Sequence, residues 1–124
     1  MMAKVTVKGL KKLERQLKYL PDQIYDGAKA ATTESVTAVY KDMRSRVPRQ
    51  SGQLHGAIGR RVRGALRGEV GVFGAKRAWW AALVEFGTSR TAAQPFAHPA
   101  AEAEAPKYSD RLRRHVGSAL DKLR

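Results

Sequence analysis

The chain has 124 residues, a formal net charge of +13 and no cysteine. This length is enough for one domain with a hydrophobic core of its own, and the lack of cysteine excludes a disulfide framework and thiolate chemistry. No apolar run approaches the roughly 20 residues of a membrane helix, and no apolar block follows Lys4 and Lys8 as in a signal peptide. We therefore expect one soluble, intracellular domain over residues 1–124, with no membrane contact.

The positive charge is concentrated in two parts of the chain. Residues 1–20 carry six basic residues against Glu14, and residues 51–80 carry six against Glu69, a net +5 in each case. Residues 21–50 and 81–124 contribute only +1 and +2. An excess of this size indicates contact with a polyanion or an acidic partner, and a solvated face that keeps the protein soluble is an equally good interpretation.

Residues 3–47 are expected to contain a strand and two helices. Val5 and Val7 alternate with polar residues and predict a short strand. Leucines spaced three and four apart predict a helix over residues 10–20, which Pro21 ends. Pro21 suits the start of a second helix that reaches Val47 and is about 40 Å long. Its apolar stripe comprises Ile24, Ala28, Ala31, Ser35, Val39 and Met43.

Residues 48–74 are expected to form a turn and an antiparallel hairpin. Alternating residues from Gly59 predict one strand, Arg67-Gly68 the turn, and Glu69 to Gly74 the return strand, with Val70 and Val72 facing inward. The alternation of a strand would divide the basic run 60–67 between two faces. The glycines of this segment lack the spacing of a nucleotide-binding loop.

Residues 77–98 are expected to form a central helix and a loop that it presents. The helix over 77–86 is the most apolar stretch of the chain and contains both tryptophans, so we expect Trp80, Leu83 and Phe86 in the core. Gly87 is suited to end this helix in a backbone conformation that a side chain would disfavour. The loop after it is polar, so we expect few internal contacts in it.

Pro95, Phe96 and Pro99 are expected to fasten the far end of this loop to the body of the protein. A helix over 99–123 then completes the chain, and we favour a break in it at Pro106. Together these elements predict an α+β fold: a short antiparallel sheet packed against a long N-terminal helix pair, with a short central helix and a C-terminal helix.

The sequence offers no convincing catalytic or metal site. The three histidines lie far apart without a neighbouring carboxylate at ligand spacing, so neither a metal nor a cofactor is expected. Glu85 is the single acid of an apolar helix, and we interpret it as a structural partner of Arg90 that braces the loop. The chain is therefore not expected to be an enzyme.

Three features resemble one family of proteins. They are the opening strand with Gly9 and Leu10 before two helices, the segment VPRQSGQLHGAI at 47–58, and, most specifically, LVEFGTSRTAAQPFAHPA at 83–100. They are similar to the tail-component family of long-tailed, double-stranded DNA bacteriophages, the neck or tail-completion proteins also called gene-product-ten-like. The middle segment departs from the family pattern, because Gln50 and His55 stand where the family has an acid and a basic residue.

The resemblance implies a structural virion protein of the phage neck, active in tail completion or head–tail joining and assembled in the host cytoplasm. It implies a homo-oligomeric ring around the DNA channel, a hexamer or, as the alternative, a dodecamer, bound to other neck and tail proteins. We expect the ring contact to use Gly87, Thr88, Ser89, Arg90, Gln94 and Phe96, together with the C-terminal helix.

Four arginines are expected to supply electrostatic attraction without base recognition, toward packaged DNA or an acidic neighbour. No aromatic residue stands among them to stack on bases. The competing hypothesis is a small basic protein that binds nucleic acid regardless of sequence. The four residues are Arg60, Arg61, Arg63 and Arg67.

Overall fold

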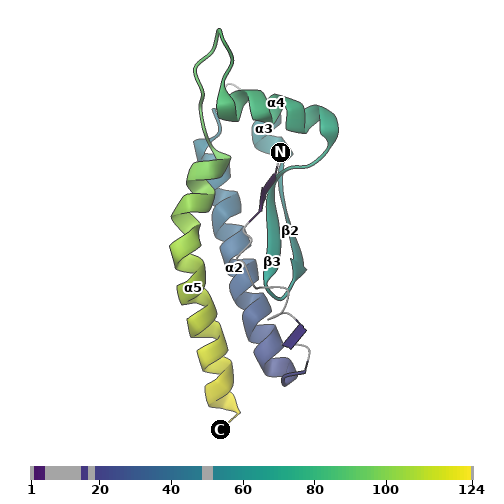
Figure 1. The fold of residues 1–124 in the computed structure, drawn as a ribbon, viewed down its shortest axis with the longest axis vertical. Coiled ribbons are helices and arrows are strands. Elements are labelled where there is room, and N and C mark those ends of the chain that lie inside the picture. The colour runs from purple at the N-terminus through teal and green to yellow at the C-terminus, as the bar shows by residue number, and fades with distance from the viewer. Residues whose placement is uncertain (1, 5–14, 17–18, 49–51, 124) are drawn as a thin grey trace.

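The computed structural model describes residues 2–4, 15–16, 19–48 and 52–123. In these ranges it has two long helices that lie side by side, a small sheet beside one of them, and a shorter helix across one end (Figure 1). This arrangement confirms the predicted α+β class. The elements are β1 (Met2–Lys4), α2 (Asp22–Arg46), α3 (Gly52–Ala57), β2 (Ile58–Gly64), β3 (Arg67–Val72), α4 (Ala75–Phe86) and α5 (Ala97–Lys122).

Two predictions for the N-terminal part cannot be compared fully with the structure. The strand expected at Val5 and Val7, and most of the helix expected over 10–20, lie outside the described residues. The described strand at this end is β1, which pairs with β3. The long helix that packs against α2 is α5, from the other end of the chain.

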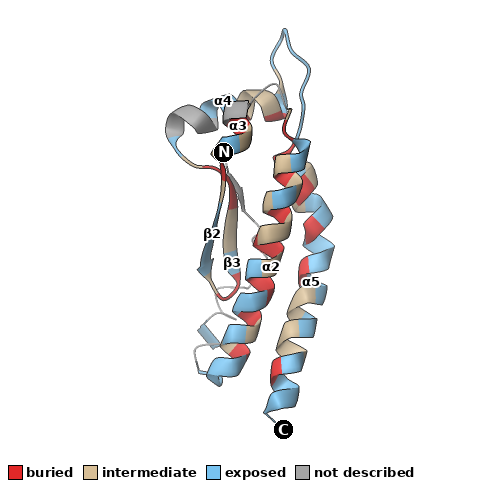
Figure 2. Ribbon diagram, turned by 180° about the vertical axis from the view of Figure 1, so that it is seen from behind, coloured by how far each residue is buried: buried red, intermediate tan, exposed pale blue. Residues whose placement is uncertain are grey.

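Helix α2 begins and ends where the sequence predicts. Pro21 occupies the N-cap with an extended backbone, and Val47 is extended at the C-cap because Pro48 follows it. The predicted stripe is the buried side of the helix, as the red residues along α2 show (Figure 2). Its buried residues are Ile24, Ala28, Ala31, Thr32, Ser35, Val36, Val39 and Met43.

The three strands form one antiparallel sheet in the order β1-β3-β2. Ile58 pairs with Val72, and Met2 pairs with Gly71 on the other side of β3. Val70 and Val72 face the core, as predicted. The sheet packs one face on α2.

The turn of the hairpin differs from the prediction. It lies at Ala65 and Leu66, two residues before Arg67-Gly68, and the register shifts between Val62 and Gly64. Both turn residues are buried in a small cluster with residues of α2 and α5. An apolar turn is therefore stable here because the two helices remove it from water.

A buried polar contact fixes this turn against both long helices. The hydroxyl oxygen of Thr32, on α2, lies 2.5 Å from the carbonyl oxygen of Ala65 and 2.6 Å from the hydroxyl oxygen of Tyr108, on α5. The hairpin also lies very close to α2: a Cβ added at Gly68 would be 2.1 Å from the Cγ2 of Val36. The hairpin is thus held in one position on the helix pair.

The predicted centre of the core was wrong. Trp80 is 43% exposed and Phe86 is 64% exposed, while Leu83 is half-buried. The main core instead gathers residues of α2, β2, β3, the buried side of α4 and the start of α5. Its largest fully buried side chains are Phe96, Met43, Val39 and Val72.

Helix α5 also differs from the prediction, since it is continuous from Ala97 through Pro106 to Lys122. A proline inside a helix leaves the carbonyl four residues earlier without its donor. That carbonyl belongs to Glu102, which is exposed like Pro106, so water can take the place of the missing donor. The expected break is therefore unnecessary.

Ion pairs join α5 to α2 on their outer side. The carboxylate of Glu34, on α2, contacts Arg111, Arg114 and His115, with 2.6 Å between its Oε2 and Nε2 of His115. Hydrogen bonds from His115 and then Arg114 lower the pKa of Glu34 from 4.5 to about 2. Arg111 also donates from its Nε to the buried Glu104, at 2.7 Å.

Candidate functional site

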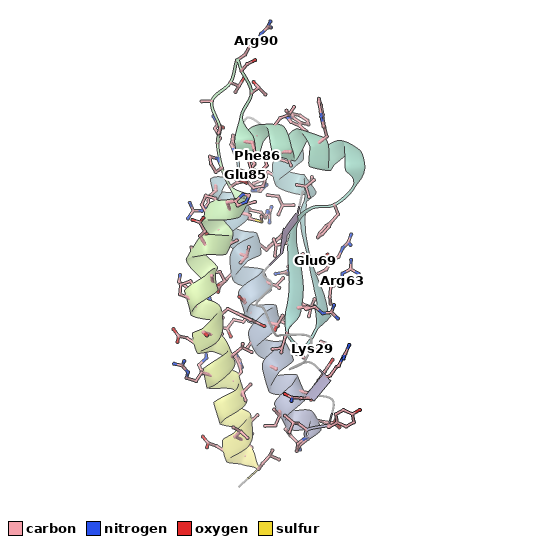
Figure 3. All side chains as sticks on the ribbon, in the orientation of Figure 1. Lys29, Arg63, Glu69, Glu85, Phe86 and Arg90 are labelled. Carbon is pink, nitrogen blue, oxygen red and sulfur yellow. The ribbon has the colours of Figure 1, made fainter. Side chains whose placement is uncertain are left out.

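The loop of residues 87–96, between α4 and α5, projects from one end of the molecule (Figure 3). Arg90 lies at its tip, and Glu85 and Phe86 lie at its base. Residues 88–95 are all exposed. The structure thus presents Thr88, Ser89, Arg90 and Gln94 to solvent, as the sequence predicts, whereas Phe96 is fully buried and anchors the loop.

Gly87 sets the direction in which the loop leaves α4. Its φ is +77°, and its N–H donates to the carbonyl of Leu83 at 2.8 Å. Side chains are disfavoured at such a positive φ. A Cβ here would also lie 2.7 Å from the backbone nitrogen of Ala93 and 2.9 Å from the carbonyl oxygen of Thr91. The prediction that Gly87 adopts a conformation disfavoured for side chains is therefore confirmed, and the close return of the loop adds a second reason for glycine.

The loop has more internal hydrogen bonds than its polar sequence suggests. The hydroxyl of Thr88 accepts from the backbone N–H groups of Arg90 at 3.2 Å and Thr91 at 3.0 Å. The N–H of Thr88 donates to the carbonyl of Thr91 at 2.9 Å, and that of Gln94 donates to the carbonyl of Val84 at 2.9 Å. The expectation of few internal contacts was wrong, because a threonine hydroxyl can replace backbone partners in a turn.

The buried carboxylate of Glu85 fastens the far end of the loop. It accepts from the backbone N–H of Ala97 at 2.7 Å and from that of Phe96 at 3.2 and 3.3 Å. These N–H groups begin α5, where a helix has no acceptors of its own and its dipole favours a negative charge. Glu85 is 2% exposed and its Oε2 lies 3.7 Å from Nδ1 of His98.

The predicted pair of Glu85 with Arg90 was therefore wrong. Arg90 lies at the loop tip, far from the carboxylate at the base (Figure 3). Glu85 still has a structural role, but its partner is the first turn of α5. The sequence carries no pattern for this contact, because the donors are backbone N–H groups eleven and twelve positions away from Glu85.

Large aromatic side chains are exposed on α4 beside the loop. Trp79 is 70% exposed, and Trp79, Leu83 and Phe86 follow at four- and three-residue spacing, which places them on one side of the helix. The opposite side, with Ala81 and Glu85, faces the core. The ring of Phe86 packs edge-on against His98, with 5.7 Å between centroids. Clustered exposed aromatic residues are typical of a surface that binds another protein.

The four predicted arginines do not form one cluster. Arg60 faces α2: its guanidinium lies over the ring of Tyr40, 4.8 Å from the centroid, and Nη1 donates to the hydroxyl of Thr37 at 3.0 Å. Arg61 and Arg63 lie on the other face, where they contact Phe73 at 3.8 Å and Glu69 at 3.4 Å. The fourth, Arg67, is exposed at the start of β3. The division predicted from strand alternation is thus what the structure shows.

Within the described ranges, no group of three His, Cys, Asp or Glu side chains could hold a metal ion. Over the same ranges, no helix is both long and apolar enough to cross a membrane. The site is thus best described by its surfaces: an ordered projecting loop, an aromatic helix side and two separated groups of arginines.

A loop held out from a rigid end of an α+β domain is a feature of proteins that bind other proteins. Comparison with known families defines the class as a bacteriophage tail component. Residues 11–87 match the family described as "Bacteriophage HK97-gp10, putative tail-component". The chain belongs to this HK97-gp10-like family, and as a tail component it is part of the virion.

The family match ends at Gly87 and so includes α2, the hairpin, α4 and the first residue of the projecting loop, but not the rest of the loop or α5. No curated protein and no solved structure matches the chain.

Proposed function

We propose that this tail component acts in the phage neck, in tail completion or head–tail joining, as one subunit of a homo-oligomeric ring around the DNA channel. The proposal gives the protein a structural rather than a catalytic role. It assigns the contact with a neighbouring subunit to the loop of residues 87–96 and to α5. A hexamer is the favoured ring and a dodecamer the alternative.

The observation that carries the proposal is the anchoring of the loop. Ten residues, 87–96, leave the body of the protein, yet both ends are fixed, by Gly87 at one and by Glu85 and the buried Phe96 at the other. A loop ordered before binding loses little conformational entropy when it meets a partner. The exposed aromatic side of α4 lies at the base of the same loop and extends the apolar area available to a neighbour.

A ring needs heterologous contacts, in which one surface of a subunit meets a different surface of the next. The loop projects from one end of the molecule, while α5 runs along its side (Figure 1). The loop and the exposed length of α5 are different surfaces, as such a contact requires.

The test is a variant in which Thr88–Arg90 are replaced by Gly-Ser-Gly. The proposal expects a chain with nearly normal thermal stability that no longer forms rings or joins heads to tails. Electron microscopy of particles made with this variant, or without the protein, should then show tailless heads beside free tails. Normal particles would contradict the assignment of the loop. Normal joining in particles that lack the whole protein would contradict the neck role.

A second candidate function is sequence-independent binding of nucleic acid, alone or within the channel of the ring. The net charge of +13 and the exposed Arg60, Arg61 and Arg63 favour it. The test is the affinity for duplex DNA at increasing salt, measured for the native chain and for the Arg61→Gln/Arg63→Gln double variant. A steep loss of affinity with salt, reduced in the variant, would support this function. Affinity that is equal in the two proteins would exclude a role for these arginines in DNA binding.

A further inference from the structure

Strand β2 forms one edge of the sheet. The strand order is β1-β3-β2, so β3 pairs with only one of the two sides of β2. Helix α2 packs on one face of the strand, and β1, at the opposite edge of the sheet, contacts α5. In both views no other described element lies beside the outer side of β2 (Figures 1 and 2). The backbone N–H and C=O groups on that side therefore lack hydrogen-bond partners in the described part of the chain.

The free edge of β2 is long enough to accept another strand. Residues 60–63 are all exposed, and the buried Ile58 holds the beginning of the strand in the core. The pairing with β3 is regular from Ile58 to Val62 and shifts register before Gly64. The regular part extends about 17 Å, the length of an ordinary strand. Such an edge is a template on which an extended segment of another chain can form main-chain hydrogen bonds.

The side chains of β2 select the segment that can pair there. Arg61 and Arg63 lie on the outer face of the sheet, where Glu69 is 3.4 Å from Arg63. The guanidinium of Arg61 lies 3.8 Å from the centre of the Phe73 ring and has no ion pair within the described ranges. A guanidinium stacked on a ring is ordered, yet its N–H groups can still meet an acceptor. This face of the edge thus has an excess of positive charge.

The charge disfavours two partners that a second copy of the chain could provide. Strand β2 of a second copy would place arginines opposite arginines, and like charges directly opposite each other destabilise a strand pair. The projecting loop of a second copy carries Arg90 and no acidic residue. Carboxylates at alternate positions of an added strand would instead lie on the same face as the two outer arginines. The arginines therefore exclude unselective pairing and favour an acidic strand.

We infer that an acidic, extended segment of another protein adds to β2 as a fourth strand. Its backbone pairs with the outer side of residues 58–62, and its alternate Asp or Glu side chains reach Arg61 and Arg63. A peptide suits this edge better than a nucleic acid duplex, because the groups without partners are backbone N–H and C=O in alternation. Arg60 lies on the opposite face of the strand, over Tyr40, so the arginines of β2 present no common surface to a duplex.

This inference goes beyond the proposed function, because the edge belongs to the isolated subunit whether or not rings form. The probe is a short peptide of alternating glutamate and threonine. A second peptide has the same side chains but a methyl group on every backbone nitrogen, so it keeps the charge and cannot donate to β2. The readout is amide hydrogen exchange in β2, followed by NMR with and without each peptide at equal ionic strength.

We expect the first peptide to bind saturably and to slow the exchange of alternate amides of β2, those that face away from β3. The methylated peptide should bind at least about tenfold more weakly, since main-chain hydrogen bonds supply the affinity. Arg61→Gln/Arg63→Gln should bind the first peptide about fivefold more weakly than the native chain. The matched control is Arg46→Gln/Arg113→Gln, which removes two arginines from α2 and α5, outside the sheet, and should bind like the native chain.

Equal binding of the two peptides, or binding without slower exchange in β2, would overturn the inference, because attraction between charges alone explains either result. Equal affinities of the two double variants would overturn the assignment to an acidic segment. Exchange that slows when the native chain is concentrated without peptide would assign the edge to a second copy instead. Duplex DNA that protects the same amides would overturn the assignment to a peptide, and DNA that leaves their exchange unchanged would support it.

Discussion

The carboxylate of Glu85 and the backbone N–H of Ala97 are 2.7 Å apart, although eleven residues lie between them along the chain. This hydrogen bond connects the last turn of α4 to the first turn of α5 and closes the base of the projecting loop. A side chain of one helix thus caps another. Together with Gly87 and the buried Phe96, this contact fixes the loop and the start of α5.

Replacement of Glu85 by Ala should therefore lower the free energy of unfolding by about 3 kcal/mol, because two buried N–H groups lose an ionised acceptor. Glu85→Gln keeps one acceptor oxygen and should cost less. Urea unfolding of both variants measures the difference. Glu102→Gln, on an exposed position of α5, is the control and should be neutral. A Glu85→Ala variant as stable as the native chain would show that the cap does not hold the loop.

Replacement of Gly87 by Ala should cost about 1–3 kcal/mol, because alanine is disfavoured at a φ of +77° and its Cβ would meet the backbone of Ala93. Gly56→Ala is a matched control, since Gly56 lies in α3 with nothing within 4 Å of an added Cβ. Alanine favours helix, so the control should be neutral or slightly stabilising. Equal thermal stability of the two variants would mean that the loop can leave α4 in another direction.

Local sequence patterns predicted the elements that depend on local causes. Helix α2 carries its apolar stripe and a proline at each end, and both limits are confirmed to within a residue. The hairpin was predicted from alternation, but its turn was misplaced. Ala65 and Leu66 form the turn because α2 and α5 bury them, and no rule for turn residues includes that tertiary contact.

The two tryptophans show that an apolar composition alone does not predict burial. The stretch from Trp79 to Phe86 is the most apolar of the chain, yet α4 lies at one end of the core and can bury only one side. Trp79, Leu83 and Phe86 share one side of the helix through their i, i+4, i+7 spacing, and only the packing decides whether that side faces the core or solvent. The small residue Ala81 lies on the buried side.

The free energy of unfolding should fall in acid because Glu34 becomes protonated. Its folded pKa of about 2 is below the unfolded value of 4.5, so its stabilisation is present above pH 4.5 and is lost as the pH falls toward 2. Because a third of this side chain is exposed, we expect the loss to be about 1 kcal/mol. Urea unfolding between these pH values measures it.

The difference between the native chain and Glu34→Gln should therefore shrink toward zero at the acid end of this range. Asp110→Asn, at a largely exposed position of α5, should show no such convergence. If the free energies of unfolding of Glu34→Gln and the native chain differ by the same amount at all pH values, protonation of Glu34 does not cause the loss of stability in acid.

The final prediction separates the aromatic residues of the core from those of the surface. Phe96 is fully buried in the main cluster, so Phe96→Ala should lower the free energy of unfolding by about 3–5 kcal/mol. Phe86→Ala, at an exposed position, should cost about 1 kcal/mol or less and leave the isolated subunit folded. If the aromatic side of α4 meets a neighbour, the same Phe86 variant should nevertheless reduce the mass of the assembled oligomer in light scattering. A Phe86→Ala chain that unfolds as readily as Phe96→Ala would show that Phe86 belongs to the core. A Phe86→Ala chain that assembles normally would show that Phe86 takes no part in the contact between subunits.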